Sequence, residues 1–360
     1  MHYLEILWYI SLAILFSYHL IIFRIPRQRP VLNTPTDPPG VSIIIAVKNG
    51  SDQLSGNLRT FMVQDYPLFE IIVVDDYSDT GEKRKLEEAI FDLPQVILHH
   101  SNRKPGKKNA LTLGIEKAKH GFILCTDADC SPVDKTWISN MMKQGGGNNV
   151  VLGYSPYILS SGWLNRIIRF ETVMTGIQYL SWAGQGKPYM GVGRNILYPK
   201  DLFQKTDPYQ DQGHIPYGDD DLWVQAAASS TPINVCVDKS AHVYSRPATS
   251  WANWFRQKHR HMSAGHYYTS SAWWRPGLYG ITLIIHWLLV IVLAIVSLNQ
   301  WVIILFCLGL LVRWITYARW TRVLGDRDTI FWYPVLELFY AAYLAGMGLI
   351  TTLKKKKTWN

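Results

Sequence analysis

The sequence predicts an α/β domain with a mostly parallel sheet, set between membrane helices at the two ends of the chain. Three observations lead to this prediction. Strand-like and helix-like segments alternate from residue 41 to residue 127, and long apolar runs lie near both termini. Only 18% of the 360 residues are charged, whereas soluble proteins usually have about 25%. The same composition excludes a disordered chain and a purely soluble enzyme.

The first apolar run, residues 4–23, is long enough for a bilayer core, which needs about 20 apolar residues. It has one charged residue, Glu5, and it is followed by Arg24 and Arg27. A cleaved signal peptide would need basic residues before the run and a small-residue cleavage site after it. We therefore expect residues 1–24 to be a retained anchor, and the arginines behind it place the next domain in the cytoplasm.

Residues 25–40 contain five prolines and predict an extended linker. The domain that follows is expected to span residues 41–245, and its strands and helices alternate. The predicted strands are residues 41–47, 70–75, 95–99 and 121–127, and the predicted helices are 54–64, 81–91 and 109–119. Such alternation implies right-handed βαβ crossovers and a mostly parallel sheet.

Ligands of parallel sheets bind beyond the carboxyl ends of the strands. Two pairs of aspartates stand at such ends, Asp75 with Asp76 and Asp127 with Asp129. The turn after the first strand contains neither GxGxxG nor GxxxxGK[ST], which disfavours a dinucleotide-binding enzyme and a P-loop ATPase. The sequence therefore predicts an acidic ligand site of another kind.

Asp127 and Asp129 flank one small residue, so both carboxylates can reach a single hard cation. Mg²⁺ or Mn²⁺ is usually held by one or two carboxylates together with substrate phosphates. A solvated turn or helix cap is the competing interpretation, because Asp-x-Asp is a short pattern. The position after a buried strand favours the metal site.

Two further side chains fit a nucleotide at the same edge. Asp76 closes the second strand and could accept hydrogen bonds from a nucleoside base. Lys107 stands where a loop opens a helix, and a cation beside a helix N-terminus suits a diphosphate.

Three consecutive aspartates, residues 219–221, precede an apolar helical stretch. One or two of them could simply cap the helix. Like charges packed together raise the pKa of at least one carboxyl, which suits a general base.

Residues 246–275 are expected to form an amphipathic interfacial region, because 251–261 is both aromatic and basic. Gln257 and Arg260 lie three residues apart, hence on one helix face, where both could meet a phosphate. A helix that contacts only lipid is an equally good interpretation.

Residues 276–353 contain two or three further membrane segments. The runs 278–298 and 301–317 are clear candidates, whereas 335–353 is diluted by Glu337. A third crossing would place the basic tail, residues 354–360, outside the cell, against the positive-inside rule. The last segment is therefore either a crossing that breaks the rule or a re-entrant or interfacial segment.

With these residues in line, the sequence resembles the membrane-bound branch of glycosyltransferase family 2, which includes cellulose and hyaluronan synthases and ceramide glucosyltransferases. Six short motifs in the family's order carry the resemblance, between about residue 41 and residue 261. They are Val74-Asp-Asp-Tyr-Ser-Asp79, Gly106-Lys-Lys-Asn-Ala-Leu111, Thr126-Asp-Ala-Asp129, Gly191-Val-Gly-Arg-Asn195, Gly218-Asp-Asp-Asp-Leu222 and Gln257-Lys-His-Arg-His261.

The resemblance implies a GT-A fold, a nucleotide-sugar donor, most often UDP-linked, and inversion at the anomeric carbon. It also implies a role for each matching side chain. Asp76 would bind the nucleobase, Lys107 the diphosphate and Asp127 with Asp129 the metal region, with Asp129 as the more direct ligand of Mn²⁺ or Mg²⁺.

The same resemblance places Gln257, Arg260 and His261 over the donor's phosphates, and Arg194 and Asn195 on the acceptor side. Asp220, with Asp219 second, would be the general base.

Two positions depart from the family pattern. The last motif normally ends in Trp, and His261 stands there, which puts a stacking role at the acceptor entrance in doubt. Cys130 follows the Asp-x-Asp motif where polymer synthases commonly have His, which mildly disfavours that subgroup.

These expectations make the protein an inverting transferase that adds one sugar to a hydroxyl of a membrane lipid at the cytoplasmic face. A bacterial inner membrane is the expected location, and a homo-oligomer is compatible with the sequence. The enzymatic alternatives are a processive polysaccharide synthase and a transferase that acts on polyprenyl phosphate. A catalytically silent membrane adaptor is the alternative outside enzymes.

The four cysteines show no CxxC pair, so reduced thiols are expected in a cytoplasmic domain. A nucleic-acid partner is not expected, because no basic-aromatic binding module is present.

Overall fold

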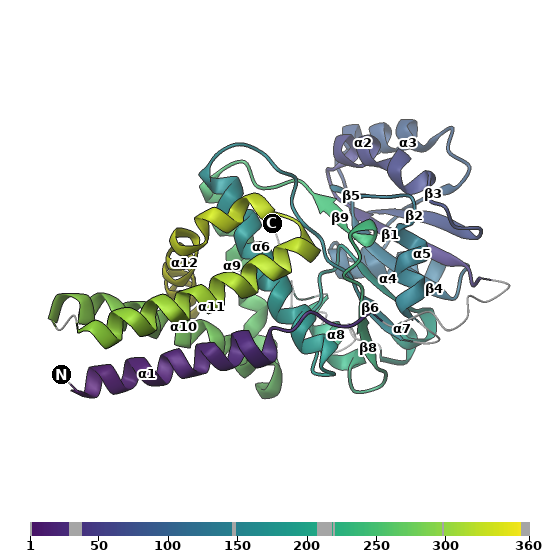
Figure 1. Cartoon of the computed structure of the whole chain (residues 1–360). Helices are drawn as coiled ribbons and strands as arrows, with labels where there is room; N and C mark the ends of the chain where they lie inside the picture. Colours follow the sequence, from purple (N-terminus) through teal and green to yellow (C-terminus); the bar gives the residue numbers. More distant parts are fainter. Residues whose placement is uncertain are drawn as a thin grey trace. The chain divides into compact units, whose positions relative to one another are not determined.

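The structure is a computed structural model that describes residues 2–28, 38–145, 149–206, 218, 220–296 and 299–353. The chain divides into two compact units (Figure 1). The sheet unit consists mainly of Arg27–Ile158 and Met190–Pro247. The helical unit consists of Met1–Pro26, Leu159–Tyr189 and Ala248–Lys356. Leu159–Tyr189 thus belongs to the helical unit although it lies within the predicted domain 41–245.

The sheet unit is built on a seven-stranded sheet of order β3-β2-β1-β4-β7-β6-β8 among the described residues. β1, β2, β3 and β4 pair in parallel, whereas β7 is antiparallel to both β4 and β6. This arrangement confirms the predicted α/β class with a mostly parallel sheet. The strands of the large sheet are β1 Val41–Val47, β2 Phe69–Asp75, β3 Val96–His100, β4 Phe122–Asp127, β6 Val150–Leu152, β7 Ile196–Pro199 and β8 Ile233–Val235.

The central strand β1 is buried on both faces, which is why its sequence is an almost continuous aliphatic run. Ile43 and Ile45 pack in one core with Leu54 and Trp137. Helices on this face are α2 Ser51–Met62, α3 Thr80–Ile90 and α5 Trp137–Gly145, and α2 and α3 lie side by side (Figure 1).

Helix α4, Lys107–Lys117, packs against β1 and β2. Gly114 permits this close approach, because a Cβ there would lie only 2.7 Å from Ile44 Cγ2. The contact fixes the start of α4 beside the carboxyl ends of β1 and β2. Two short helices, α7 Lys200–Thr206 and α8 Asp221–Ala227, complete the unit.

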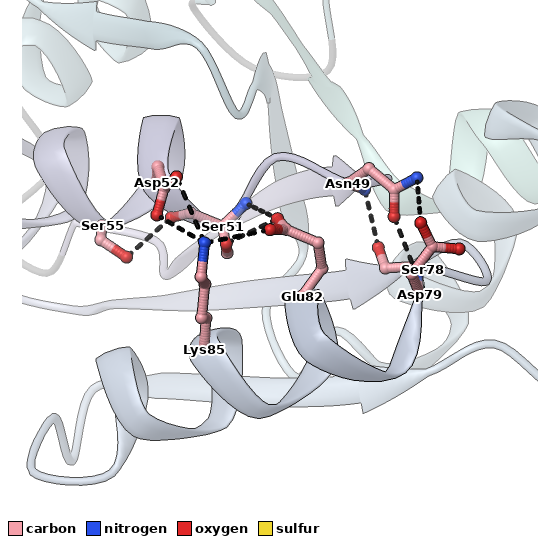
Figure 2. A network of polar contacts seen from close by, with 8 residues as sticks. All are labelled: Asn49, Ser51, Asp52, Ser55, Ser78, Asp79, Glu82 and Lys85. Atoms are coloured by element: carbon pink, nitrogen blue, oxygen red, sulfur yellow. Dashed lines mark hydrogen bonds and ion pairs between the residues drawn. The ribbon is translucent and has the colours of Figure 1, made fainter.

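The loops that leave β1 and β2 are tied to each other by polar side chains (Figure 2). Asn49, which has a φ of 51°, accepts from Asp79 N at 2.9 Å and donates to the Asp79 carboxylate at 3.2 Å. Ser51 Oγ donates to Glu82 at 2.6 Å, and Lys85 bridges Glu82 and Asp52. These contacts hold the two loops together at the carboxyl ends of β1 and β2.

The helical unit contains four helices that are long and apolar enough to cross a membrane, which marks the chain as a membrane protein. They are His2–Ile22, Ser270–Val296, Gln300–Leu324 and Arg327–Leu353. The unit's helices are α1 His2–Ser17, continued by a π-helical turn Tyr18–Ile22, α6 Trp163–Gly184, α9 Trp251–Ser263, α10 Ser270–Val296, α11 Gln300–Leu324 and α12 Tyr333–Leu353.

The N-terminal helix α1 lies alongside α10 and α11 (Figure 1). Its Trp8 ring stacks on His286 of α10, with ring centroids 5.8 Å apart. At its other end the Trp320 indole of α11 donates to the Phe23 carbonyl at 3.0 Å. The two ends of the sequence thus form one bundle.

Helix α6 is held in the helical unit by charged side chains. Arg169 pairs with Asp326 and Asp328, and Glu171 pairs with Lys258 of α9. Most of this helix is buried, including the polar side chains of Asn165 and Gln178.

A second buried ion pair joins α11 to α12. The Arg313 guanidinium donates to both oxygens of Glu337, at 2.8 and 3.1 Å, and Tyr333 donates to Glu337 at 2.6 Å. Neither Arg313 nor Glu337 is more than 1% exposed. The charge that weakens the apolar run at 335–353 is therefore neutralised inside the unit.

Replacing Glu337 by alanine leaves the buried Arg313 without its carboxylate. We expect the free energy of unfolding to fall by about 3–5 kcal/mol, because an uncompensated buried charge is costly. Thermal unfolding in detergent, followed by tryptophan fluorescence, measures this. Glu88→Ala removes an exposed partner of Arg84 and should change stability by less than about 1 kcal/mol. Equal stability of the two variants would contradict a stabilising role for the buried Arg313–Glu337 ion pair.

Candidate active site at the carboxyl edge of the sheet

Asp76 follows β2 and is 1% exposed. Its backbone N–H donates to the Val47 carbonyl at 2.7 Å. Its carboxylate accepts from Gly106 N–H through both oxygens, at 2.9 and 3.0 Å. Gly106 has a φ of 147°, a conformation that side chains disfavour. Asp76 therefore holds the loop that leads into α4 against the edge of the sheet.

The neighbouring Asp75 stabilises the turn itself. It accepts from Ser78 N–H at 3.1 Å, and its other oxygen lies 3.2 Å from His100 Nδ1. Lys83 Nζ lies 3.8 Å from the same carboxylate. The two aspartates of this pair thus have separate structural partners.

Lys107 is the first residue of α4, and its ammonium group lies 2.9 Å from Asp127 Oδ1 at the end of β4. Both side chains are about 30% exposed, at 28% and 30%. The ion pair brings two residues from separate motifs to one solvent-accessible place. The N-terminus of α4 adds to the positive potential there.

Asp129 is fixed by a second, two-stranded sheet, in which β5 Cys130–Pro132 is antiparallel to β9 Val243–Ser245. The register places Ser245 opposite Cys130. Ser245 Oγ consequently donates to Asp129 Oδ2 at 3.0 Å.

Asp127, Asp129 and Cys130 present one potential ligand atom each within 4.8 Å of one another. Burial first, and then the charges of Asp129 and Asp127, raise the pKa of the Cys130 thiol well above its usual range. Its Sγ donates to Asp129 Oδ1 at 3.4 Å, as a protonated thiol would. The donor set that remains is a pair of carboxylates, which fits a hard divalent cation.

Arg194 adds a permanent cation to the same region. Its guanidinium lies 4.7 Å from the centre of the Tyr157 ring and 3.5 Å from the Ser155 carbonyl. Burial lowers the pKa of Arg194, but negative charge nearby, including that of Asp127 and Asp129, shifts it upward overall. The side chain therefore stays charged beside the two carboxylates.

Asn195 is enclosed by polar contacts. It is fully buried, its amide N–H groups donate to the Tyr154 and Ala241 carbonyls at 2.9 and 2.8 Å, and its oxygen accepts from Trp137 Nε1 at 3.0 Å. The side chain therefore holds three segments of the sheet unit together, and its predicted place on the acceptor side stays a prediction.

Asp220 precedes α8 and acts as its N-cap. Its two oxygens accept from Gly193 N–H at 2.8 Å and from Asp221 N–H at 3.0 Å. The acidic cluster is thereby joined to the glycine-rich motif 191–195. Asp219 lies outside the described residues, and its role stays a prediction.

Gln257, Arg260 and His261 lie on α9 of the helical unit. Gln257 and Arg260 are half-buried and His261 is exposed. Their predicted part in binding the donor's phosphates stays a prediction.

Three residues of the site were not anticipated. Gly106, whose N–H donates to Asp76, directly precedes Lys107, and only the lysine was predicted to have a role. Ser245 and Tyr157 reach Asp129 and Arg194 through the fold, and no local pattern marks either of them.

Comparison with known proteins agrees with this geometry. Residues 42–206 match the family described as glycosyl transferase family 2. The poly-β-1,6-N-acetyl-D-glucosamine synthase of Staphylococcus epidermidis is 29% identical over 119 residues, which are 31% of this chain and 27% of the relative. The enzyme of that name from Staphylococcus aureus is 27% identical over 106 residues, 29% of this chain and 24% of the relative. The match thus spans about a quarter of the length of these relatives.

Among solved structures, the mannosyltransferase PcManGT of Pyrobaculum calidifontis, in complex with GDP-Man and Mn²⁺, superimposes with a TM-score of 0.64 at 15% identity. The superposition covers 98% of this chain and 100% of that one. This likeness concerns the fold. Together with the family match, it shows that residues 42–206 belong to a glycosyl transferase family 2 domain and that the chain has a GT-A fold.

Proposed function

We propose that the protein transfers a sugar from a nucleotide-sugar donor to a hydroxyl of a membrane lipid at the cytoplasmic face, with inversion at the anomeric carbon. The observation that supports this most directly is the Lys107–Asp127 ion pair of 2.9 Å beside Asp129. It places a cation for a diphosphate and carboxylates for a metal at one edge of the sheet.

The donor would enter with its diphosphate toward Lys107 and the N-terminus of α4. Binding of phosphate oxygens would draw the Lys107 ammonium group away from Asp127 and free that carboxylate. Asp127 and Asp129 would then hold Mg²⁺ or Mn²⁺, which when bound neutralises charge on the phosphates. Arg194 supplies a further fixed positive charge in the same region.

Asp220 is the proposed general base, with Asp219 second. Inversion requires that the base approach the acceptor hydroxyl on the face of the sugar opposite the leaving diphosphate. The two backbone hydrogen bonds to Asp220 would fix the direction of its carboxylate. A positioned base of this kind contributes about 10²–10⁴-fold to a rate.

The proposal of a lipid acceptor rests on how the helical unit is filled. Facing side chains of its helices touch directly, as in the Tyr18 and Tyr279 rings, 5.2 Å apart, and in the Arg313–Glu337 pair. Such close packing favours a helical unit that anchors the enzyme in the membrane, rather than one that forms the wall of a polymer channel. A UDP-sugar is the first donor to test, and GDP-mannose, the ligand of the fold neighbour, is the second.

Polysaccharide synthesis is the second candidate function. The named synthases of the two staphylococci, similar over a part of the catalytic domain, favour it. This activity would require the growing chain to pass through the membrane, and an oligomer could supply the additional helices.

Asp129→Asn should reduce transfer at least about 100-fold, because charge on the leaving diphosphate would lose its counter-ion. The assay is release of nucleoside diphosphate from the donor, with and without Mn²⁺. A chelator should reduce the unsubstituted protein to the same level, and added Mn²⁺ should restore it.

The matched control is Asp134→Asn, which changes an exposed aspartate of the same unit. It should leave both the rate and the metal dependence unchanged. Full metal-dependent activity in Asp129→Asn would contradict the proposed site.

Lys107→Met should raise the KM for the donor about 10- to 100-fold, because a charge-assisted hydrogen bond contributes about 1.5–3 kcal/mol. Initial rates at several donor concentrations measure this. Lys104→Met, an exposed lysine of the same loop, should change KM less than about twofold. If both variants bind the donor alike, Lys107 does not contact the diphosphate.

A further inference from the structure

Four helices of the chain could span a membrane by length and composition. We propose that α12 does not span the membrane. Instead it lies beside α9 in one surface of the bilayer, and its exposed apolar stripe contacts the boundary between headgroups and acyl chains there.

Helix α1 contacts residues at both ends of α10, as a helix that crosses the membrane beside α10 should. Tyr18 donates to the Arg275 carbonyl at 2.8 Å, and Glu5 accepts from Asn299 at 2.9 Å. Arg275 lies near the start of α10, whereas Asn299 follows its end. Over about 20 Å of helix, at 1.5 Å per residue, α1 therefore passes from one end of α10 to the other.

The same contacts define the two ends of the bundle. Close to the Tyr18 end, Thr316 of α11 donates to the His19 carbonyl and Trp320 to that of Phe23. We call this end, with the start of α10 and the last part of α11, the near end. The opposite, far end holds a cluster from α1, α10 and α11, namely Trp8, Leu12, Leu293 and Val302.

Both ends of α12 meet near-end residues. At its start, the Tyr333 ring lies 5.0 Å from Tyr317. At its last turn, the Thr351 carbonyl lies 3.2 Å from Nε2 of His266, which precedes α10. The 18 residues between them extend about 27 Å. If α12 crossed, one of these ends would lie at the far end.

The middle of α12 packs along α9 as well as against α10. Phe339 lies 6.0 Å from Trp251, and Tyr343 stacks on Trp254 at 4.9 Å. Helix α9 also contains Arg256, Lys258 and Arg260, and such a density of charge is costly in hydrocarbon. A helix that packs along α9 in this way lies at the same surface.

The depth of α12 fits a surface helix as well. Its Glu337 pairs with Arg313, which is six residues, or about 9 Å, from Arg319 on α11. Amphipathic surface helices bury their apolar face about 5–10 Å into the boundary. The ion pair is therefore within reach of the surface.

The exposed side of α12 is a regular apolar stripe, for which a bilayer surface is the matching partner. Its large residues are Val335, Leu338, Leu349, Ile350 and Leu353. Four lysines, residues 354–357, follow α12 in the sequence. A surface position of α12 satisfies the positive-inside rule, with which a fourth crossing conflicts.

Single-cysteine additions at three exposed positions test the side of the membrane. Gln300→Cys lies at the start of α11, Arg327→Cys between α11 and α12, and Thr352→Cys in the last turn of α12. Each variant of the full chain is treated with a membrane-impermeant maleimide in intact and in permeabilised cells. The unsubstituted chain, with its four cysteines, gives the background.

We expect Thr352→Cys to label under the same conditions as Arg327→Cys and opposite to Gln300→Cys. Labelling of Thr352→Cys together with Gln300→Cys would overturn the proposal. Because the comparison is relative, it holds whichever side is the cytoplasm, and it does not depend on enzymatic activity.

If the Thr352 variant fails to fold, the depth of two spin labels in the bilayer tests the orientation of α12 independently. Leu338→Cys and Leu349→Cys place spin labels on one exposed face, 11 residues apart. In nanodiscs, oxygen and nickel accessibility should give both labels nearly the same shallow depth. A crossing helix would separate their depths by about 16 Å, and that result would contradict a surface helix.

Discussion

The parallel pairing of β2, β1 and β4 is the constraint on which the site depends. Its register aligns Ala46 of β1 with Val74 on one side and with Asp127 on the other. Parallel strands end at the same edge, so Asp76 and Asp127 come to one side of the sheet although 50 residues separate them. The packing of α4 on β1 and β2 brings Lys107 to the same edge. The remaining site residues are arranged around this edge.

Much of this could be predicted because it follows from local pattern. The first four strands were expected within one or two residues, since buried parallel strands are short aliphatic runs. The start of α2 was less accurate, at Ser51 instead of residue 54, because polar residues form its first turn. Asp127 and Lys107 were predicted as site residues from two separate motifs, and in the structure they form an ion pair.

The residues that escaped prediction depend on long-range pairing. Ser245 reaches Asp129 only because β9 pairs with β5, across more than 100 residues of sequence. The structural task of Asn195 depends on carbonyls of two other segments. Helix α6 lies within the predicted domain 41–245, and the partners that place it in the helical unit, Asp326 and Lys258, are remote in sequence.

Incubation of the purified protein with lipid extract, Mn²⁺ and a panel of labelled UDP- and GDP-sugars tests the central claim most directly. Single transfer to a lipid predicts label from one donor in one band of the organic phase, and loss of that band in Asp220→Asn. High-mass label in the aqueous phase would contradict the lipid acceptor and favour polysaccharide synthesis. Absence of transfer and of donor hydrolysis under all conditions would contradict the proposed active site itself.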